Sequence, residues 1–123
     1  MHIVLDIGNC GPDYSAIRSL IESNFDAQVL RADKASDALQ LLEQQDSVSL
    51  ITVNRKLDCD YSDGIDVIRQ IKEDERFKDI PVMLITNYVE HQDAAVAIGA
   101  VRGFGKLQYR EPETHSKLAA ILT

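Results

Sequence analysis

Five short apolar runs alternate with amphipathic segments along the chain. Each run is nearly continuous in apolar residues, which is typical of strands that are buried on both faces of a sheet. Between the runs, apolar residues recur at helical spacing. The predicted strands are Ile3–Leu5, Ala27–Leu30, Val48–Val53, Pro81–Thr86 and Val101–Phe104.

The segments between and after these runs predict five helices. Pro12 and Asp13 suit a first helical turn, Asp33 can cap the second helix, and Pro112 can open the last one. The fourth helix, Val89–Ile98, is short and rich in alanine. The residues expected to face inward on the other four helices are Ile17, Leu20, Ile21 and Phe25; Ala35, Ala38, Leu39 and Leu42; Ile65, Ile68 and Ile71; and Leu118, Ile121 and Leu122.

Strands that alternate with helices indicate an α/β domain with a parallel sheet covered on both faces. Because crossovers are right-handed, few topologies remain, and we predict the doubly wound, flavodoxin-like strand order 2-1-3-4-5. We expect one domain over residues 1–123. In this architecture function lies at the carboxyl ends of the strands. The segments that matter are therefore Asp6–Pro12, Asn54–Asp63, Thr86–Asn87 and Gly105–Lys106.

Composition narrows the classes of function. The chain has 45% hydrophobic and 27% charged residues, which is ordinary for a soluble domain. A net charge of -7 argues against nucleic acid as a direct partner, because no basic stripe exists to displace counterions. No apolar run is long enough to span a membrane, and the N-terminus lacks the features of a secretion signal. Two cysteines make no disulfide framework, so we expect a cytoplasmic protein.

Polar residues follow the apolar runs in a recognisable order. Asn54 follows the third run, Thr86 ends the fourth, and Lys106 follows the fifth, while Gly64–Ile68 gives the third helix a glycine at its start. In this order, and over essentially all 123 residues, the chain resembles the CheY-like receiver domain of bacterial two-component response regulators. The resemblance implies a role in two-component signal transduction and phosphorelay, without enzymatic activity of its own.

The resemblance also implies roles for single residues. Asn54 stands where the family has its phosphate-accepting aspartate, and a neutral amide oxygen is a poor nucleophile. Thr86 corresponds to the hydroxyl that binds the phosphoryl group, and Lys106 to the pocket lysine. Phe104 is the nearest candidate for the aromatic that reports the switch state, although it lies one place closer to the lysine than in the family.

The two adjacent acids that hold magnesium in the family are not both present here. If the strands are aligned by length, Asp6 is the first acid and Ile7 replaces the second. If the chains are aligned by Pro12, Asn9 and Cys10 take these positions and Asp6 lies inside the strand. We favour the first alignment, because the second buries a lone carboxylate. Either way the acid pair is broken, so we predict a vestigial pocket of Asp6, Thr86 and Lys106 with no metal and no cofactor.

Three further hypotheses concern this region. With fewer acids in the pocket, Asp6 and Lys106 would form a direct ion pair. The loop after Asn54 contains Asp58, Asp60 and Asp63, which could bind a cation but fit a solvated acidic loop better. Cys10 and Cys59 follow neighbouring strands and are either a redox pair or, as we favour, two unrelated thiols.

These observations predict a pseudo-receiver that acts through phosphorylation-independent protein contacts. One alternative is an active receiver that is phosphorylated on Asp58 or Asp60, and another is a small-molecule sensor that uses the vacated pocket. The resemblance implies that signalling partners, or a second copy of the chain, bind the surface of the fourth helix, fifth strand and fifth helix. The residues expected to be exposed on this surface are His91, Gln92, Arg102, Gln108, Tyr109 and Arg110.

Overall fold

Five parallel strands form one sheet in the order β2-β1-β3-β4-β5, which confirms the predicted topology. A computed structural model describes the whole of residues 1–123. The strands are β1 (His2–Ile7), β2 (Ala27–Ala32), β3 (Leu50–Asn54), β4 (Val82–Ile85) and β5 (Val101–Phe104). The helices are α1 (Gly11–Asn24), α2 (Ala35–Gln44), α3 (Gly64–Glu73), α4 (Val89–Ala97) and α5 (Pro112–Leu122).

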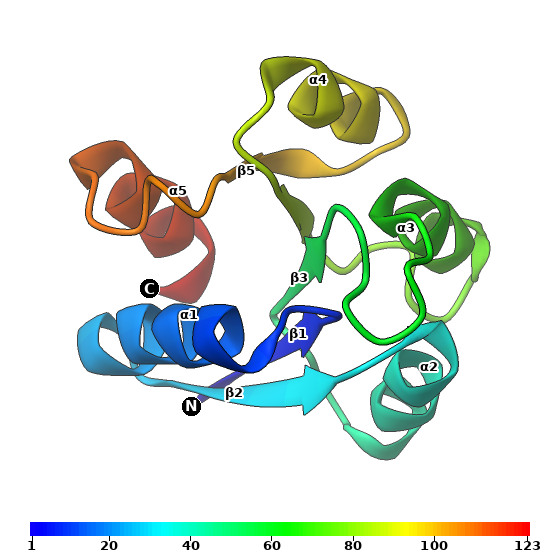
Figure 1. The fold of residues 1–123 in the computed structure, drawn as a ribbon. Coiled ribbons are helices and arrows are strands. Elements are labelled where there is room, and N and C mark those ends of the chain that lie inside the picture. The colour runs from blue at the N-terminus through cyan, green and yellow to red at the C-terminus, as the bar shows by residue number, and fades with distance from the viewer.

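Helices cover both faces of this sheet, as the apolar runs predicted. Figure 1 shows α1 and α5 on one side and α2, α3 and α4 on the other. Alternate residues of each strand enter two separate cores. On β3, Leu50 packs under α1 and α5, whereas Ile51 and Val53 pack under the other three helices. No helix combines the length and the apolar character that crossing a membrane requires.

Local chemistry explains where two of the helices begin. Pro12 lies in the first turn of α1, as expected. The carboxylate of Asp63 caps α3, where it accepts a 2.9 Å hydrogen bond from the N–H of Ile65. The prediction that Asp33 caps α2 is wrong, because Lys34 occupies the cap position and makes no side-chain cap bond. The Asp33 carboxylate instead lies 3.6 Å from the guanidinium of Arg31.

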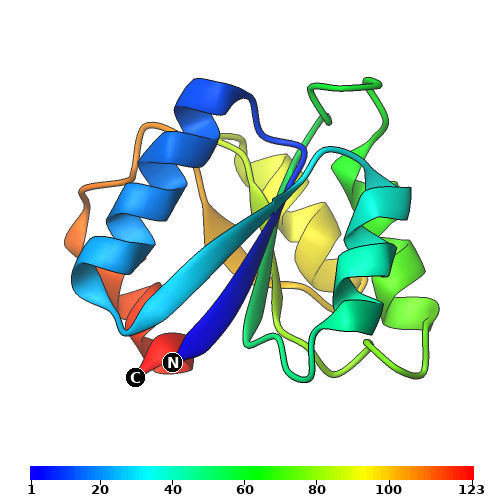
Figure 2. The same cartoon turned by 90° about the horizontal axis from the view of Figure 1, so that it is seen from below.

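The chain termini lie at one end of the sheet and the polar strand-end residues at the other. Figures 1 and 2 show both chain termini close together at the edge where β1 begins. The carboxyl ends of the strands lie at the opposite edge. There Ile7 is paired with Val53, so the next residues along these strands, Gly8 and Asn54, lie beside each other. All of the polar strand-end residues singled out above therefore lie at one edge.

Gly64 fits this edge because it has no side chain. A Cβ atom at this position would collide with the backbone carbonyl of Asn54, and the N–H of Gly64 already donates a 2.7 Å hydrogen bond to the carbonyl of Arg55. The family-like glycine at the start of α3 therefore reflects a close approach of two backbones rather than a turn.

We predict that Gly64→Ala lowers the free energy of unfolding by at least about 2 kcal/mol, because backbone must move to admit the methyl group. Gly11→Ala is the matched control, since Gly11 also opens a helix and a Cβ there meets nothing within 4 Å. The control should be neutral or slightly stabilising. Urea unfolding of both variants checks this expectation, and equal stabilities would contradict it.

Candidate functional site

A hollow of about 250 Å³ lies at the carboxyl ends of β3, β4 and β5. It brings together Asn54, Thr86 and Lys106, three residues that the sequence singled out from three different strand ends. Asp6 does not line this hollow, which corrects the predicted pocket. The lining residues are Asn54, Arg55, Lys56, Ile85, Thr86, Asn87, Tyr88, His91 and Lys106.

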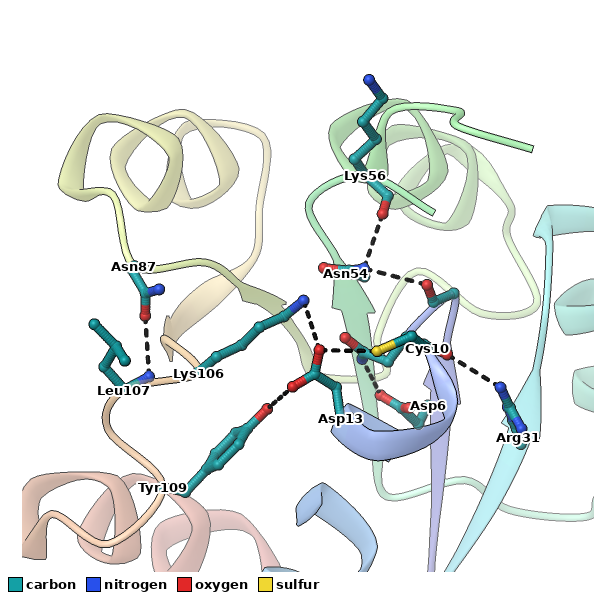
Figure 3. A network of polar contacts seen from close by, with 12 residues as sticks. Asp6, Cys10, Asp13, Arg31, Asn54, Lys56, Asn87, Lys106, Leu107 and Tyr109 are labelled. Carbon is teal, nitrogen blue, oxygen red and sulfur yellow. Dashed lines mark hydrogen bonds and ion pairs between the residues drawn. The ribbon is translucent and has the colours of Figure 1, made fainter. Parts of the chain in front are cut away.

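Asn54 closes the floor of the hollow and is 8% exposed. Its side-chain nitrogen donates to two backbone carbonyls, that of Gly8 at 3.2 Å and that of Lys56 at 2.8 Å. Both amide hydrogens are therefore used, and the orientation of the amide is fixed because its oxygen would face two other oxygens if it were turned over. The Oδ1 atom of Asn54 faces the hollow (Figure 3) and accepts no hydrogen bond within the protein.

Thr86 lies at the rim, where its hydroxyl contacts its own turn. The N–H of Tyr88 donates to the Thr86 Oγ1 atom at 3.3 Å, and Nδ1 of His91 lies 3.3 Å from the same oxygen. These contacts fix the start of α4 against the end of β4.

Lys106 makes its ion pair with Asp13, not with Asp6. The Lys106 Nζ atom lies 2.9 Å from Oδ2 of Asp13. The thiol of Cys10 also donates to Oδ2 of Asp13, and the Tyr109 hydroxyl donates to its Oδ1 (Figure 3). Partial burial opposes ionisation of Asp13, but the hydrogen bonds from Lys106, Cys10 and Tyr109 outweigh it and lower its pKa. The predicted Asp6–Lys106 pair is wrong because the first turn of α1 brings a different acid over the strand ends.

Asp6 is fully buried inside β1, where its residue pairs with Thr52 of β3. The Thr52 hydroxyl and the Asn9 amide donate to Oδ1 of Asp6 at 2.6 and 2.7 Å. The Oδ2 atom of Asp6 and the Oδ1 atom of Asn9 are buried without a partner. The favoured alignment placed Asp6 at the end of the strand, but Asp6 and Ile7 both lie within β1 and are buried.

Burial raises the pKa of Asp6 to about 6, against the opposing effect of the bonds from Thr52 and Asn9. The alignment by Pro12 was rejected because burying a carboxylate costs free energy. That cost is reduced here because the carboxyl takes up a proton more easily. A proton on Oδ2 would remove the charge from a buried oxygen that otherwise has no donor.

Phe104 belongs to the core rather than to the hollow. Its side chain is 1% exposed and packs with the residues under α1 and α5. Its ring meets that of Tyr109 edge to face, with 6.2 Å between centroids. Its side chain therefore does not line the hollow, although its backbone carbonyl accepts a 3.1 Å hydrogen bond from the N–H of Thr86.

Comparison with known families identifies this arrangement. A sequence model of the response regulator receiver domain matches residues 13–106, which is most of the chain. The chain belongs to this family. Receiver domains are modules of two-component response regulators that generally signal through other proteins and are not enzymes themselves.

Solved structures of other receivers have the same fold. A proposed response regulator from Chloroflexus aurantiacus J-10-fl matches with a TM-score of 0.84 and 17% identity over 98% of this chain and 97% of that one. A receiver protein from Pseudomonas putida matches with a TM-score of 0.77 and 20% identity, over 97% and 95% of the two chains. Chemotaxis protein CheY4 of Vibrio cholerae matches with a TM-score of 0.76 and 16% identity, over 100% and 99%. No curated protein sequence is significantly similar to this chain.

The magnesium ion that the family resemblance implies does not fit the residues of this receiver. No carboxylate lines the hollow, whereas three lining residues are cationic in type. No group of three or more histidine, cysteine, aspartate or glutamate side chains is placed to hold a metal. The carbonyl oxygens of Gly8 and Lys56 already accept hydrogen bonds from Asn54. A divalent cation prefers a set of oxygen ligands with negative charge, and this site offers none.

Gln92 was expected on the receiver surface, and this prediction is wrong because its side chain is buried. The amide nitrogen donates to the carbonyls of Leu84 and Thr86 at 2.9 and 3.3 Å, and the amide oxygen accepts from the N–H of Gly103 at 2.9 Å. The pairing of β4 with β5 is irregular at this point. Gln92 therefore replaces strand–strand hydrogen bonds that the irregularity removes, and joins α4 to both strands.

The acids of the loop after Asn54 serve the loop itself. Leu57 is fully buried and anchors the loop in the core. Asp60 accepts from the hydroxyl and the N–H of Ser62, and Asp63 caps α3. Asp58 is exposed. These contacts agree with a solvated acidic loop. Cys10 and Cys59 are both free thiols.

We predict that the buried carboxyl of Asp6 makes this receiver less stable as the pH rises from about 4 to 7. The pKa of this carboxyl is about 6 in the folded protein and 3.8 when the group is free of the fold. Between pH 3.8 and 6 the folded state therefore binds more protons than the unfolded state, and the protein loses stability as the pH rises. The loss is on the order of 2–3 kcal/mol. Urea unfolding from pH 4.5 to 7.5 measures it.

Asp6→Asn should remove this component of the pH dependence and stabilise the protein above pH 6, because its amide keeps the acceptor and adds a donor. Asp79→Asn, which changes an exposed carboxylate, is the control and should keep the wild-type dependence. Identical pH profiles for wild type and Asp6→Asn would contradict the prediction.

We also predict that Gln92→Leu lowers the free energy of unfolding by about 2–4 kcal/mol, because it leaves the N–H of Gly103 and two carbonyls without partners. Gln70→Leu is the matched control, since Gln70 is exposed on α3. Thermal and urea unfolding compare the two variants. Similar effects of both substitutions would show that the Gln92 bonds contribute little.

Proposed function

We propose that this receiver is a pseudo-receiver that signals through protein contacts without phosphorylation of residue 54. The observation that carries the proposal is the role of the Asn54 side chain. Its nitrogen holds the carbonyls of Gly8 and Lys56, which belong to two different loops. An amide cannot act as the nucleophile in phosphoryl transfer, and the metal that would neutralise the charge of a transferring phosphoryl group has no ligands here.

The positions of the other acids support the same proposal. Asp58 and Asp60 are exposed, and neither lines the hollow that contains Thr86 and Lys106. A phosphoryl group on either acid would lie outside this hollow, where these two side chains do not contact it. Phosphorylation of the loop acids would therefore not change the contacts of the hollow directly.

The proposed partner surface comprises α4, β5 and the segment that leads into α5. Four exposed apolar side chains lie on it, those of Val89, Val96, Val101 and Leu107, the last 83% exposed. Large apolar side chains on the surface of a small domain favour contact with another protein. Ion pairs such as Arg102–Asp93 supply charged groups beside them. We infer that a signalling protein binds this surface.

The Gln92 bonds support a fixed conformation of that surface. Three hydrogen bonds tie α4 to β4 and β5, and all of them must break before α4 can move relative to the strands. In addition, a Cβ atom at Gly103 would collide with the carbonyl of Leu84, so the strands approach closely here. These contacts favour one constitutive binding state over a two-state switch.

We predict that the protein gains no phosphoryl group when it is incubated with phosphoramidate and magnesium, as measured by intact mass. The reason is the absence of both a carboxylate nucleophile and a metal site in the hollow. Asn54→Asp is the companion variant, because it restores a carboxylate at the family position.

The outcomes show whether residue 54, the metal ligands or both prevent phosphorylation. A gain on the wild-type chain would refute the proposal, and peptide mapping beginning with Asp58 and Asp60 would then locate the acceptor. A gain on Asn54→Asp alone would show that Asn54 by itself prevents phosphorylation. No gain on either chain would show that the missing metal ligands matter as well.

A further inference from the structure

The two edge strands of the sheet differ in length and regularity. β5 has four residues, and its pairing with β4 is irregular. β2 has six residues and pairs with β1 in one uninterrupted register from Ala27 to Ala32. No proline interrupts β2, and Arg31 is its only charged residue. A regular edge strand of this kind presents unpaired backbone groups to which another chain can add a strand.

The backbone groups of alternate β2 residues point away from the sheet. The carbonyl of Ala32 accepts a 2.8 Å hydrogen bond from the N–H of Gly8, which follows β1, so the backbone of Ala32 faces β1. Successive residues of a strand direct their N–H and C=O groups to opposite sides. The groups that face outward are therefore those of Ala27, Val29 and Arg31, and Val29 is the middle one of the three.

Side chains of α1 occupy both outward groups of Val29. Its N–H donates a 2.9 Å hydrogen bond to Oε2 of Glu22, and its carbonyl accepts a 3.2 Å hydrogen bond from the hydroxyl of Tyr14. Figure 1 shows α1 alongside β2 at this edge. Tyr14 and Glu22 each lie one helical turn from Arg18, so the three residues share one side of α1.

Neighbouring charges hold these two side chains in place. Oε1 of Glu22 accepts a 3.1 Å hydrogen bond from Nε of Arg18, so both of its carboxylate oxygens are used. The hydrogen bond from the N–H of Val29 is the main cause that the pKa of Glu22 lies below its ordinary value. The guanidinium of Arg31 lies over the Tyr14 ring, 5.1 Å from its centre. Both contacts with Val29 are therefore supported by a second interaction.

The groups that α1 covers are the ones that a second copy of β2 would use. In an antiparallel hydrogen-bonded pair, one residue on each strand contributes both its N–H and its C=O. Two copies related by a two-fold axis would therefore pair Val29 with Val29 of the second copy. Such an interface is self-complementary, and so a second copy is the partner that this edge fits.

We propose that Tyr14 and Glu22 block strand addition at β2, and that β2, once these side chains are withdrawn, pairs antiparallel with β2 of a second copy of this chain. Both contacts are made by side chains, so substitution can remove them without a change in the helix backbone. This inference goes beyond the proposed function and is independent of it. The proposed partner surface includes β5, which is the opposite edge strand of the sheet.

The test is the double variant Tyr14→Phe/Glu22→Ala of the full chain, which removes both contacts and keeps an aromatic ring under Arg31. Hydrogen exchange of the Val29 N–H is followed by NMR at about 20 µM and about 500 µM, beside sedimentation equilibrium. In the wild type we expect protection at both concentrations. In the variant the N–H should exchange at least about tenfold faster at the lower concentration and become protected again at the higher one, as a dimer forms.

Three further variants serve as controls. Glu22→Gln keeps an acceptor oxygen for the N–H of Val29 and should behave as the wild type does. Tyr61→Phe/Glu75→Ala makes the same chemical changes at two exposed positions outside α1 and β2, and should leave Val29 protected. Glu22→Ala alone exposes only the N–H, and provides the same exchange test if the double variant does not fold.

Rapid exchange of the Val29 N–H in the wild type, or equal exchange in the wild type and Glu22→Ala, would show that α1 does not cover the edge. An N–H that stays unprotected in the double variant at the higher concentration would overturn the proposed pairing, even if the mass shows association, because the copies would then meet elsewhere. None of these results affects the phosphoramidate experiment, so failure of this inference and failure of the proposed function are distinguishable.

Discussion

Two hydrogen bonds from the Asn54 amide to backbone carbonyls determine the charge and the donor atoms at the floor of the hollow. Carbonyl groups of Gly8 and Lys56 point at residue 54 from the loops after β1 and β3. Buried carbonyls need a donor, and here one NH₂ group supplies both hydrogens. A carboxylate at this position would add a third oxygen with no donor, and would need a cation for balance. The amide thus supplies both donors without a charge or a metal, and leaves a neutral floor on which only its own oxygen has no partner.

The two acids near the strand ends, Asp13 and Asp6, differ in how deeply they are buried. Asp13 is partly exposed and surrounded by donors, whereas Asp6 lies in the sheet with one oxygen unpaired. These environments move their pKa values in opposite directions, Asp13 down and Asp6 up. The lysine next to the hollow therefore has an ionised partner on α1, while the deeper acid is the one that readily becomes neutral. Two carboxyls of similar position in the sequence have different physical roles.

The sequence predicted the fold well because double burial leaves a strong signal in each strand. The run from Val101 to Phe104 and the helix from Pro112 were placed at the observed bounds. The site was predicted in part. Residues 54, 86 and 106 converge because the ends of parallel strands share an edge. Their roles in ligand binding and signalling remain predictions.

The errors have physical causes that the pattern could not show. Gln92 is polar and one turn into an amphipathic helix, so its burial depends on a strand irregularity that has no sequence signal. Asp13 was taken as a first-turn residue, although an acid at the start of α1 and a lysine after β5 lie at the same edge. The Asp6 error came from treating a buried carboxylate as necessarily ionised. Phe104 fills the core because its side chain lies on the face of the sheet that α1 and α5 cover.

The closeness of the two termini has a practical consequence. Both ends emerge where β1 begins, at the edge of the sheet away from the hollow. A tag, a fluorescent protein or a further domain fused at either end would leave the strand-end edge open to solvent. The old ends could also be joined by a short linker and new ends opened in the exposed acidic loop at Asp60, which would give a circular permutant with the same sheet.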